Sequence, residues 1–382
     1  MNKHEDVKTE KMFNHDKHLD RLRGIAIILV MICHFFAHSD KSGSGFNLVI
    51  LNYDLKQILL PLGGVGVGIF FQLSAYLLTL NILEGKYPKL SNYFIKRFRR
   101  IYPAFLTFSI MYILFYKLSG KYDYASDISS FKYLTTSILF LQPLLIFSQY
   151  NSVDVLPGTW SLYPEIYFYI FLPLIVMLLA KRFLRINLLT LIILLTLLFR
   201  FNFMNESNWA IRSSLLYYFD FFCVGTIIAY LKFEGKFDYL RFIKPVFGWF
   251  LIILSITGKL PTIDSYLLMN IGAGVLMVAA VSKKEQAKNE YWVLSKLAKY
   301  SYGLFLSHIF IFWYISVPLL NHMNINNSYH RFLIGSVIAL ATSFSLSGFH
   351  IIRLKSIFKS VLRRSFFSGA LTFLLHVCLQ DF

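Results

Sequence analysis

The chain has 382 residues, of which 56% are hydrophobic and only 15% carry a charge, and its mean hydropathy is +0.56. Soluble domains average about 25% charged residues, so this balance excludes an ordinary water-soluble domain and favours a protein embedded in a lipid bilayer. The formal net charge of +18 does not indicate nucleic acid as a partner, because the basic residues lie between apolar runs rather than on a soluble face.

Ten apolar segments are long enough, or nearly long enough, to cross a bilayer, which takes about 20 residues. In chain order they lie near 22–38, 57–81, 101–118, 164–180, 186–200, 212–231, 245–257, 263–281, 299–319 and 332–353. The pattern predicts an all-α fold, a polytopic bundle of about ten transmembrane helices. No polar stretch is long enough to bury a core of its own, so residues 1–364 are expected to form a single membrane domain.

An eleventh apolar stretch, 131–149, decides the topology together with the basic residues. If the N-terminus is cytoplasmic and 131–149 does not cross, most Lys and Arg fall in cytoplasmic segments. A full crossing would move every later basic cluster outside, against the positive-inside rule. We therefore expect both termini in the cytoplasm, with 131–149 re-entrant or interfacial at the outer surface. The apolar tail 365–382 is too short to span and is expected to lie at the membrane interface.

The first span carries two ionisable side chains, Arg23 and His34. Eleven residues separate them, which places both on nearly the same helix face, about 16 Å apart along the axis. An ionisable group inside a span is costly and is therefore a functional candidate. Arg23 can hold the phosphates of an anionic donor, while His34 activates a hydroxyl deeper in the membrane. The alternatives are a snorkelling anchor for Arg23 and a packing histidine for His34.

A basic run precedes the third span, and within it Arg97 and Arg100 are three residues apart and share a helix face. Guanidinium groups fit phosphate oxygens, although a basic run beside a span is also an ordinary topology signal. Four glycines of the second span are interpreted as helix-packing residues rather than a phosphate loop. These are Gly63, Gly64, Gly66 and Gly68.

The segment before the fourth span ends in Thr159-Trp160-Ser161-Leu162-Tyr163-Pro164-Glu165. A carboxylate at this point can bind a sugar hydroxyl or orient an imidazolium. The alternative is an exposed glutamate that the helix dipole favours at an N-terminus.

The ninth span carries a second intramembrane histidine, His308, after Ser301 and Tyr302. Ser301 and His308 are about 10 Å apart on one helix, too far for a nucleophile and its base. His34 and His308 have no third ligand at a suitable spacing, and the three cysteines are scattered, so no metal site is expected.

Taken together, these strings resemble the acyltransferase 3 family of bacterial integral-membrane O-acyltransferases of surface polysaccharides. Leu19 to Gly24 matches the family's Leu-Asp-x-Leu-Arg-Gly opening, and His34 follows at the family's spacing. The resemblance runs from about residue 19 to 353. Its other motifs are Phe70 to Ser74, the Arg-x-x-Arg of Arg97 to Arg100, Trp160-Ser161-Leu162 with Glu165, and Ser301-Tyr302 with His308. The departures are Ala75, where the family usually has Gly, Phe305, where it has Tyr, the lack of an acid after Ser347, and the apolar tail after Arg364.

The resemblance implies an O-acyltransferase of the bacterial cytoplasmic (inner) membrane. It would move an acyl group, with acetyl expected, from cytoplasmic acyl-CoA to a hydroxyl of a surface polysaccharide or its lipid-linked precursor. His34 would be the general base, and Glu165, from the outer side, would position the acceptor or the imidazole. The donor phosphates would bind Arg23, Arg97 and Arg100. The substrate would contact Trp160, Ser161, Tyr302 and His308.

A transporter or flippase of a lipid-linked sugar is the alternative from another class. It would also explain ten spans, and its intramembrane histidines could serve proton coupling. Equivalent halves or paired broken helices would favour it, and the sequence shows no such symmetry. A catalytically inactive scaffold in the same fold is a weaker alternative, and the sequence makes no prediction of oligomeric state.

Overall fold

The computed structural model describes residues 16–38, 49–50, 53–118, 131–145, 156–203, 209–240, 242–257, 265–282 and 292–361. These residues are almost entirely helical, which confirms the predicted all-helical fold. The exception is a small antiparallel hairpin of β1 (Val49–Ile50) and β2 (Tyr53–Asp54), in which Val49 pairs with Asp54. The tail 365–382, expected at the membrane interface, lies outside the described residues.

Ten of the helices correspond to the ten apolar segments of the sequence. They are α2 (Lys17–His38), α4 (Pro61–Leu83), α5 (Leu90–Leu118), α8 (Leu162–Leu178), α9 (Arg182–Asn202), α11 (Leu215–Phe233), α12 (Pro245–Ile256), α13 (Ser265–Val281), α14 (Trp292–Ile311) and α16 (Ser328–Val361). Shorter helices are α3 (Leu55–Leu59), α7 (Phe131–Ile138), α10 (Trp209–Arg212) and α15 (Val317–His322). A π-helical turn at Phe312–Ser316 joins α14 to α15.

Within the part of the chain that the structure describes, seven helical segments are long and apolar enough to cross a membrane, so the chain is a multi-pass membrane protein. They are Gln57–Leu83, Leu90–Leu118, Thr159–Leu178, Arg185–Asn202, Ala210–Phe233, Trp292–His322 and Tyr329–Ser347. The helices α12 and α13 are apolar but shorter. The full count of ten crossings and the cytoplasmic position of both termini stay predictions.

The segment 131–149 does not form one long helix over its described part. The eight residues of α7 span about 12 Å, far less than the hydrocarbon core of a bilayer. The chain then turns at Phe140, whose φ is +57°, and continues as a 3₁₀ turn at Gln142–Leu145. The Phe140 ring packs against Phe105 and Tyr163 at centroid distances of 4.7 and 5.5 Å. This folded-back course supports the prediction that the segment does not cross, while 146–149 lie outside the described residues.

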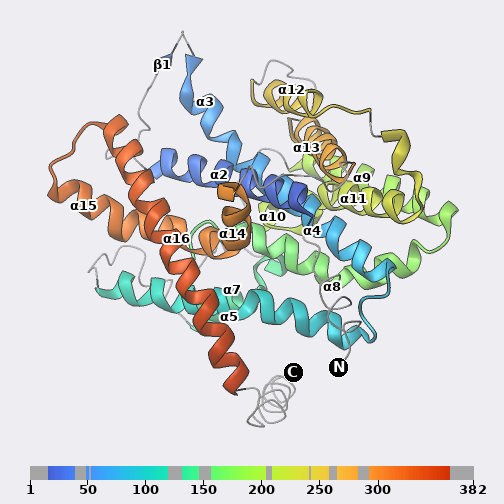
Figure 1. Ribbon diagram of the computed structural model, residues 1–382, viewed down its shortest axis with the longest axis horizontal. Coiled ribbons are helices and arrows are strands. Elements are labelled where there is room, and N and C mark those ends of the chain that lie inside the picture. The colour runs from blue at the N-terminus through green and yellow to red at the C-terminus, as the bar shows by residue number, and fades with distance from the viewer. Residues whose placement is uncertain are drawn as a thin grey trace, which may run out of the picture.

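Helix α4 lies at the centre of the bundle and packs against α2, α8, α11 and α13. In Figure 1, α12 and α13 lie together at the top edge, α5 lies at the bottom, and α16 runs obliquely past α14. The close approach of α2 to α4 depends on Gly66, because a Cβ there would lie 2.5 Å from the carbonyl oxygen of Ala26. The interpretation of these glycines as packing residues is confirmed at this position.

The outer surface of the bundle is apolar, as lipid contact requires. Large hydrophobic side chains are exposed along α5, α8, α9, α12 and α16, among them Leu114, Met177, Leu198, Val246 and Val337. In a water-soluble protein such a surface would drive aggregation. Here it faces hydrocarbon, while the interior is a mainly apolar core in which polar side chains such as Gln72 and Ser307 are buried.

Candidate functional site

Among the cavities that the described residues form, two adjoin each other, and we call the side chains that line both of them the partition. The larger one, of about 720 Å³, is lined by Arg23, Arg97 and Arg100, and we call it the arginine cavity. The smaller one, of about 490 Å³, is lined by His34 and we call it the histidine cavity. Val67 and Phe305 line both cavities.

Two arginines of the arginine cavity, Arg23 and Arg97, differ in what they contact. Arg23 donates from Nη1 to Oδ1 of Asp20 at 3.1 Å, and both side chains are largely buried. Nε of Arg97 is buried and has no hydrogen-bond partner within the described part of the chain. Guanidinium groups form strong, charge-assisted hydrogen bonds with phosphate oxygens. The arginine cavity can therefore hold an anionic ligand, and Arg97 has bonding capacity left for it.

Two tyrosines fix the helix that carries Arg97 and Arg100. Helix α5 begins at Leu90, so both arginines lie within its first three turns rather than before the helix. The Tyr302 hydroxyl donates to the Ile101 carbonyl at 2.9 Å and joins α14 to α5. The Tyr93 hydroxyl donates to the Tyr169 carbonyl at 2.9 Å and joins α5 to α8. These bonds hold the arginines at the wall of the cavity.

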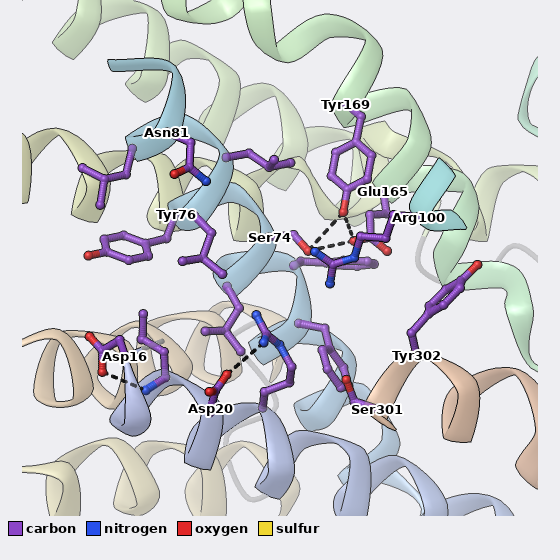
Figure 2. A pocket seen from close by; sticks show the side chains of 18 of the residues that line it. Asp16, Asp20, Ser74, Tyr76, Asn81, Arg100, Glu165, Tyr169, Ser301 and Tyr302 are labelled. Carbon is purple, nitrogen blue, oxygen red and sulfur yellow. Dashed lines mark hydrogen bonds and ion pairs between the residues drawn. The ribbon is translucent and has the colours of Figure 1, made fainter. Parts of the chain in front are cut away.

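Glu165 is the centre of a hydrogen-bonded cluster in the arginine cavity. The Ser74 hydroxyl donates to Oε1 of Glu165 at 2.7 Å. The Tyr169 hydroxyl donates to the same oxygen and lies 3.3 Å from Oγ of Ser74. Figure 2 shows this cluster with the Arg100 side chain beside it and Tyr302 and Ser301 across the cavity. The carboxylate is thus fixed on the same side of the partition as the arginines.

The histidine cavity combines one imidazole with an aromatic wall. His34 lines it together with Trp160, Tyr218 and Tyr266. The Trp160 and Tyr218 rings lie 5.2 Å apart, and Tyr266 packs edge-on to Tyr218 at 6.1 Å. Aromatic faces provide large apolar contact at a low entropic cost, and the tyrosine hydroxyls add polar ends. The cavity suits a ligand with both apolar faces and hydroxyl groups.

His308 packs behind His34, with the two ring centroids 5.2 Å apart. Its Nδ1 lies 3.1 and 2.8 Å from the carbonyl oxygens of Leu304 and Phe305. Because a carbonyl only accepts, Nδ1 carries the proton of the neutral ring and Nε2 is left as an acceptor. This Nε2 is buried without a partner among the described residues. His308 lines neither cavity, so it contacts the site through His34.

A tight turn before α8 passes directly over His34. Gly158 has a φ of +79°, and a Cβ there would lie 2.4 Å from Cδ1 of Ile309 and 3.7 Å from Nε2 of His34. Only glycine adopts this backbone without strain and leaves that space. The 3₁₀ turn that follows, Thr159–Ser161, places Trp160 in the histidine cavity and Ser161 in the arginine cavity.

Apart from His308, which lines neither cavity, the predicted site residues divide into two groups. Arg23, Arg97, Arg100, Glu165, Ser161 and Tyr302 line the arginine cavity, and His34 and Trp160 line the histidine cavity. Glu165 is expected to position the acceptor or the imidazole, and the structure places it in the arginine cavity, which His34 does not line. Helix α8 begins at Leu162, and Glu165 lies in its first turn. There its carboxylate accepts a hydrogen bond from Ser74 on α4.

A buried polar network beside the histidine cavity was not predicted from the sequence. Arg200 donates from Nη2 to Oδ2 of Asp220 at 2.9 Å, and Asn270 donates to the same oxygen at 3.1 Å. Gln72 donates to Oδ1 of Asn270 at 2.7 Å. The Arg200 guanidinium also lies 5.3 Å from the ring of Tyr266. The sequence contains a signal for this network, because Arg200 and Asp220 carry opposite charges within two successive apolar segments.

Comparisons with known proteins place the chain among acyltransferases. A family model described as an acyltransferase domain matches residues 16–348. The chain is similar to the peptidoglycan O-acetyltransferase OatA of Listeria monocytogenes, with 29% identity over 173 residues. That match covers 43% of this chain and 24% of the relative, so the chain spans about a quarter of the relative's length. No solved structure matches the chain.

Proposed function

This chain belongs to the acyltransferase domain family, and we propose that it is an O-acyltransferase of the bacterial cytoplasmic membrane. Its donor is cytoplasmic acyl-CoA, with acetyl as the acyl group. Its acceptor is a hydroxyl of a surface polysaccharide or of the lipid-linked precursor of one. The observation that carries this proposal is the cavity lined by three arginines, separated by two side chains from a cavity lined by His34.

The arginine cavity is proposed to hold the donor. Coenzyme A carries several phosphate groups, and guanidinium forks bind phosphate with both charge and geometry. The buried, unpartnered Nε of Arg97 supports this assignment, because a buried donor without a partner costs free energy until a ligand satisfies it. Ser161 and Tyr302, which line the same cavity, would contact the substrate near its acyl end.

The histidine cavity is proposed to hold the acceptor hydroxyl. His34 would take the hydroxyl proton as the oxygen attacks the thioester carbonyl. The C–S bond breaks, a C–O ester bond forms, and the proton passes from His34 to the departing thiolate. Trp160 would contact the acceptor, and His308 would hold the His34 ring through the ring contact of 5.2 Å.

Glu165 is proposed to act on the donor side. Its bonds to Ser74 and Tyr169 fix a negative charge among the arginines. A fixed carboxylate orients neighbouring guanidinium groups before the ligand arrives, which lowers the cost of binding. Glu165 would therefore affect the chemistry through the position of the donor.

The transporter alternative gains no support from these observations. Membership of an acyltransferase family favours group transfer, and the name of the Listeria relative supports an acetyl group and a glycan acceptor. The two hypotheses still differ in one measurable respect. If the chain is an acyltransferase, loss of His34 abolishes acylation of the product. If it is a transporter, loss of His34 abolishes export of the polysaccharide.

The test is mass spectrometry of surface polysaccharide from cells that express the wild-type chain, His34→Ala, His38→Ala or no protein. His38 is the matched control, because its ring stacks 6.1 Å from His34 on the same helix but lines neither cavity. We expect an acyl mass increment with the wild type and with His38→Ala, and none with His34→Ala. The increment identifies both the acyl group and the sugar.

Identical spectra in all four samples would overturn the proposed function, provided that the three expressing samples contain the protein in their membranes. An increment that persists in His34→Ala would remove His34 from the role of base. Loss of the polysaccharide itself, rather than of its acyl groups, would favour the transporter.

A further inference from the structure

The partition between the two cavities consists of apolar side chains from two different helices. Val67 on α4 and Phe305 on α14 line both cavities. Both side chains are nearly buried, at 6% and 8% exposure. The phosphate-binding groups therefore lie on one side of Val67 and Phe305, and the imidazole of His34 lies on the other.

The backbone on which Val67 sits has little room to move. Val67 lies between Gly66, which is against α2, and Gly68, where a Cβ would lie 2.5 Å from the ring of Phe221 on α11. Helix α4 is in close contact with α2 and α11. The space between the two cavities beside Val67 therefore depends on side-chain size rather than on helix movement. The helix that carries Phe305 is also in close contact with a neighbour, since a Cβ at Gly303 would lie 2.7 Å from Oγ of Ser347 on α16.

We infer that Val67 and Phe305 select the length of the acyl group that the enzyme transfers. The inference rests on the proposed function, because it assumes a donor in the arginine cavity and a hydroxyl in the histidine cavity. The acyl end of the donor must then pass between these two side chains to reach the hydroxyl. A two-carbon group needs little space there, whereas every further methylene must fit beside a valine and a phenylalanine.

The reaction itself is the same for every chain length. The thioester C–S bond breaks, the ester C–O bond forms, and the hydroxyl proton ends on the sulfur of coenzyme A. Only the volume that the acyl tail needs at the partition changes. Widening the partition is therefore expected to change the preference among donors more than the rate with the shortest donor.

The experiment uses inside-out membrane vesicles from expressing cells, whose cytoplasmic face is open to added donor and whose own glycans are the acceptor. Radiolabelled acetyl-, butyryl- and hexanoyl-CoA are supplied separately to the wild type, Phe305→Leu, Val67→Ala and Phe310→Leu. Phe310 is the matched control, because it is a buried phenylalanine of the same helix that lines neither cavity. Label transferred to glycan is measured for each donor.

We expect the ratio of butyryl to acetyl transfer to rise about tenfold or more in Phe305→Leu and in Val67→Ala, and to stay at the wild-type value in Phe310→Leu. Acetyl transfer with unchanged ratios in both partition variants would overturn the inference while leaving the proposed function intact. A wild type that transfers none of the three groups would overturn the proposed function and this inference with it. Equal changes in Phe305→Leu and Phe310→Leu would assign the effect to loosened packing and overturn the inference.

Discussion

Two of the arginines in the arginine cavity show how the same residue type can have different bonding states within one site. Arg23 is already bonded to Asp20, so part of its charge is neutralised by the protein. Arg97 has a buried Nε with no partner in the described ranges. A bound phosphate would satisfy Arg97 more than Arg23, because an unsatisfied buried donor gains most from a new acceptor.

This difference predicts that Arg97→Lys weakens donor binding although it keeps the charge. Lysine has no planar fork and does not place a donor where Nε lies. A charge-assisted hydrogen bond contributes roughly 1.5–3 kcal/mol, so we expect KM for acyl-CoA to rise about tenfold or more with a smaller change in kcat. Initial rates in inside-out vesicles over a range of donor concentrations measure both constants.

The control for this prediction is Arg99→Lys. Arg99 is an exposed neighbour on the same helix and does not line the arginine cavity. Its KM is expected to match that of the wild type. An equal rise in KM for both variants would mean that overall positive charge near the membrane, and not the fork of Arg97, attracts the donor.

At the scale of the helices, the buried polar network joins four elements of the bundle. Arg200 belongs to α9, Asp220 to α11, Asn270 to α13 and Gln72 to α4, and each is at most 3% exposed. In the interior of a membrane protein such groups find partners in one another rather than in water. The network therefore fixes the relative register of helices whose apolar faces would otherwise pack in several ways.

The network predicts an asymmetric response to substitution. Asp220→Asn leaves the buried charge of Arg200 without its counter-ion and is expected to cost about 3–5 kcal/mol of stability. The double variant Arg200→Met with Asp220→Leu removes both charges and is expected to be more stable than Asp220→Asn. Thermal unfolding in detergent gives the unfolding temperatures of the purified wild type, Asp220→Asn and the double variant, and so ranks their stabilities.

Asn202→Ala is the control for this series, because Asn202 is exposed at the end of α9. Its unfolding temperature is expected to stay near that of the wild type. A double variant less stable than Asp220→Asn would show that the ion pair contributes more than the desolvation that it costs.

For the whole molecule, the orientation in the membrane decides whether the arginine cavity, which is proposed to hold the donor, lies on the cytoplasmic side. The positive-inside rule predicts that Lys89, between α4 and α5, is cytoplasmic and that Asn324, between α15 and α16, is outside. Both residues are exposed in the structure. Cysteines introduced at these two positions can therefore be used to test which face of the membrane each loop occupies.

Cysteine labelling tests this orientation. In a variant with Cys33, Cys223 and Cys378 changed to Ser, we expect Asn324→Cys to react with a membrane-impermeant maleimide on intact cells. Lys89→Cys is expected to react only after permeabilisation. The reverse pattern would place the arginine-bearing end of α5 outside and would contradict a cytoplasmic donor.

The features that the sequence predicts are those determined by neighbouring residues. Apolar runs predict the helices because a backbone in lipid must satisfy its own hydrogen bonds. The spacing of Arg97 and Arg100 likewise predicts a shared helix face, since helical periodicity is local. One limit differs from the apolar run, because α5 starts at Leu90 whereas the apolar run starts near residue 101, so the basic run belongs to the same helix.

The tertiary structure alone decided which of these residues meet. Arg23 and His34 share α2 as predicted, yet they open into different cavities. Glu165 joins Ser74 and His308 joins His34 across separations of 91 and more residues. Hydropathy does not determine such pairings, because a lipid-facing and a buried apolar residue look alike in sequence. The partition of Val67 and Phe305 depends on the same packing, since glycine contacts and buried hydrogen bonds fix how closely the helices approach.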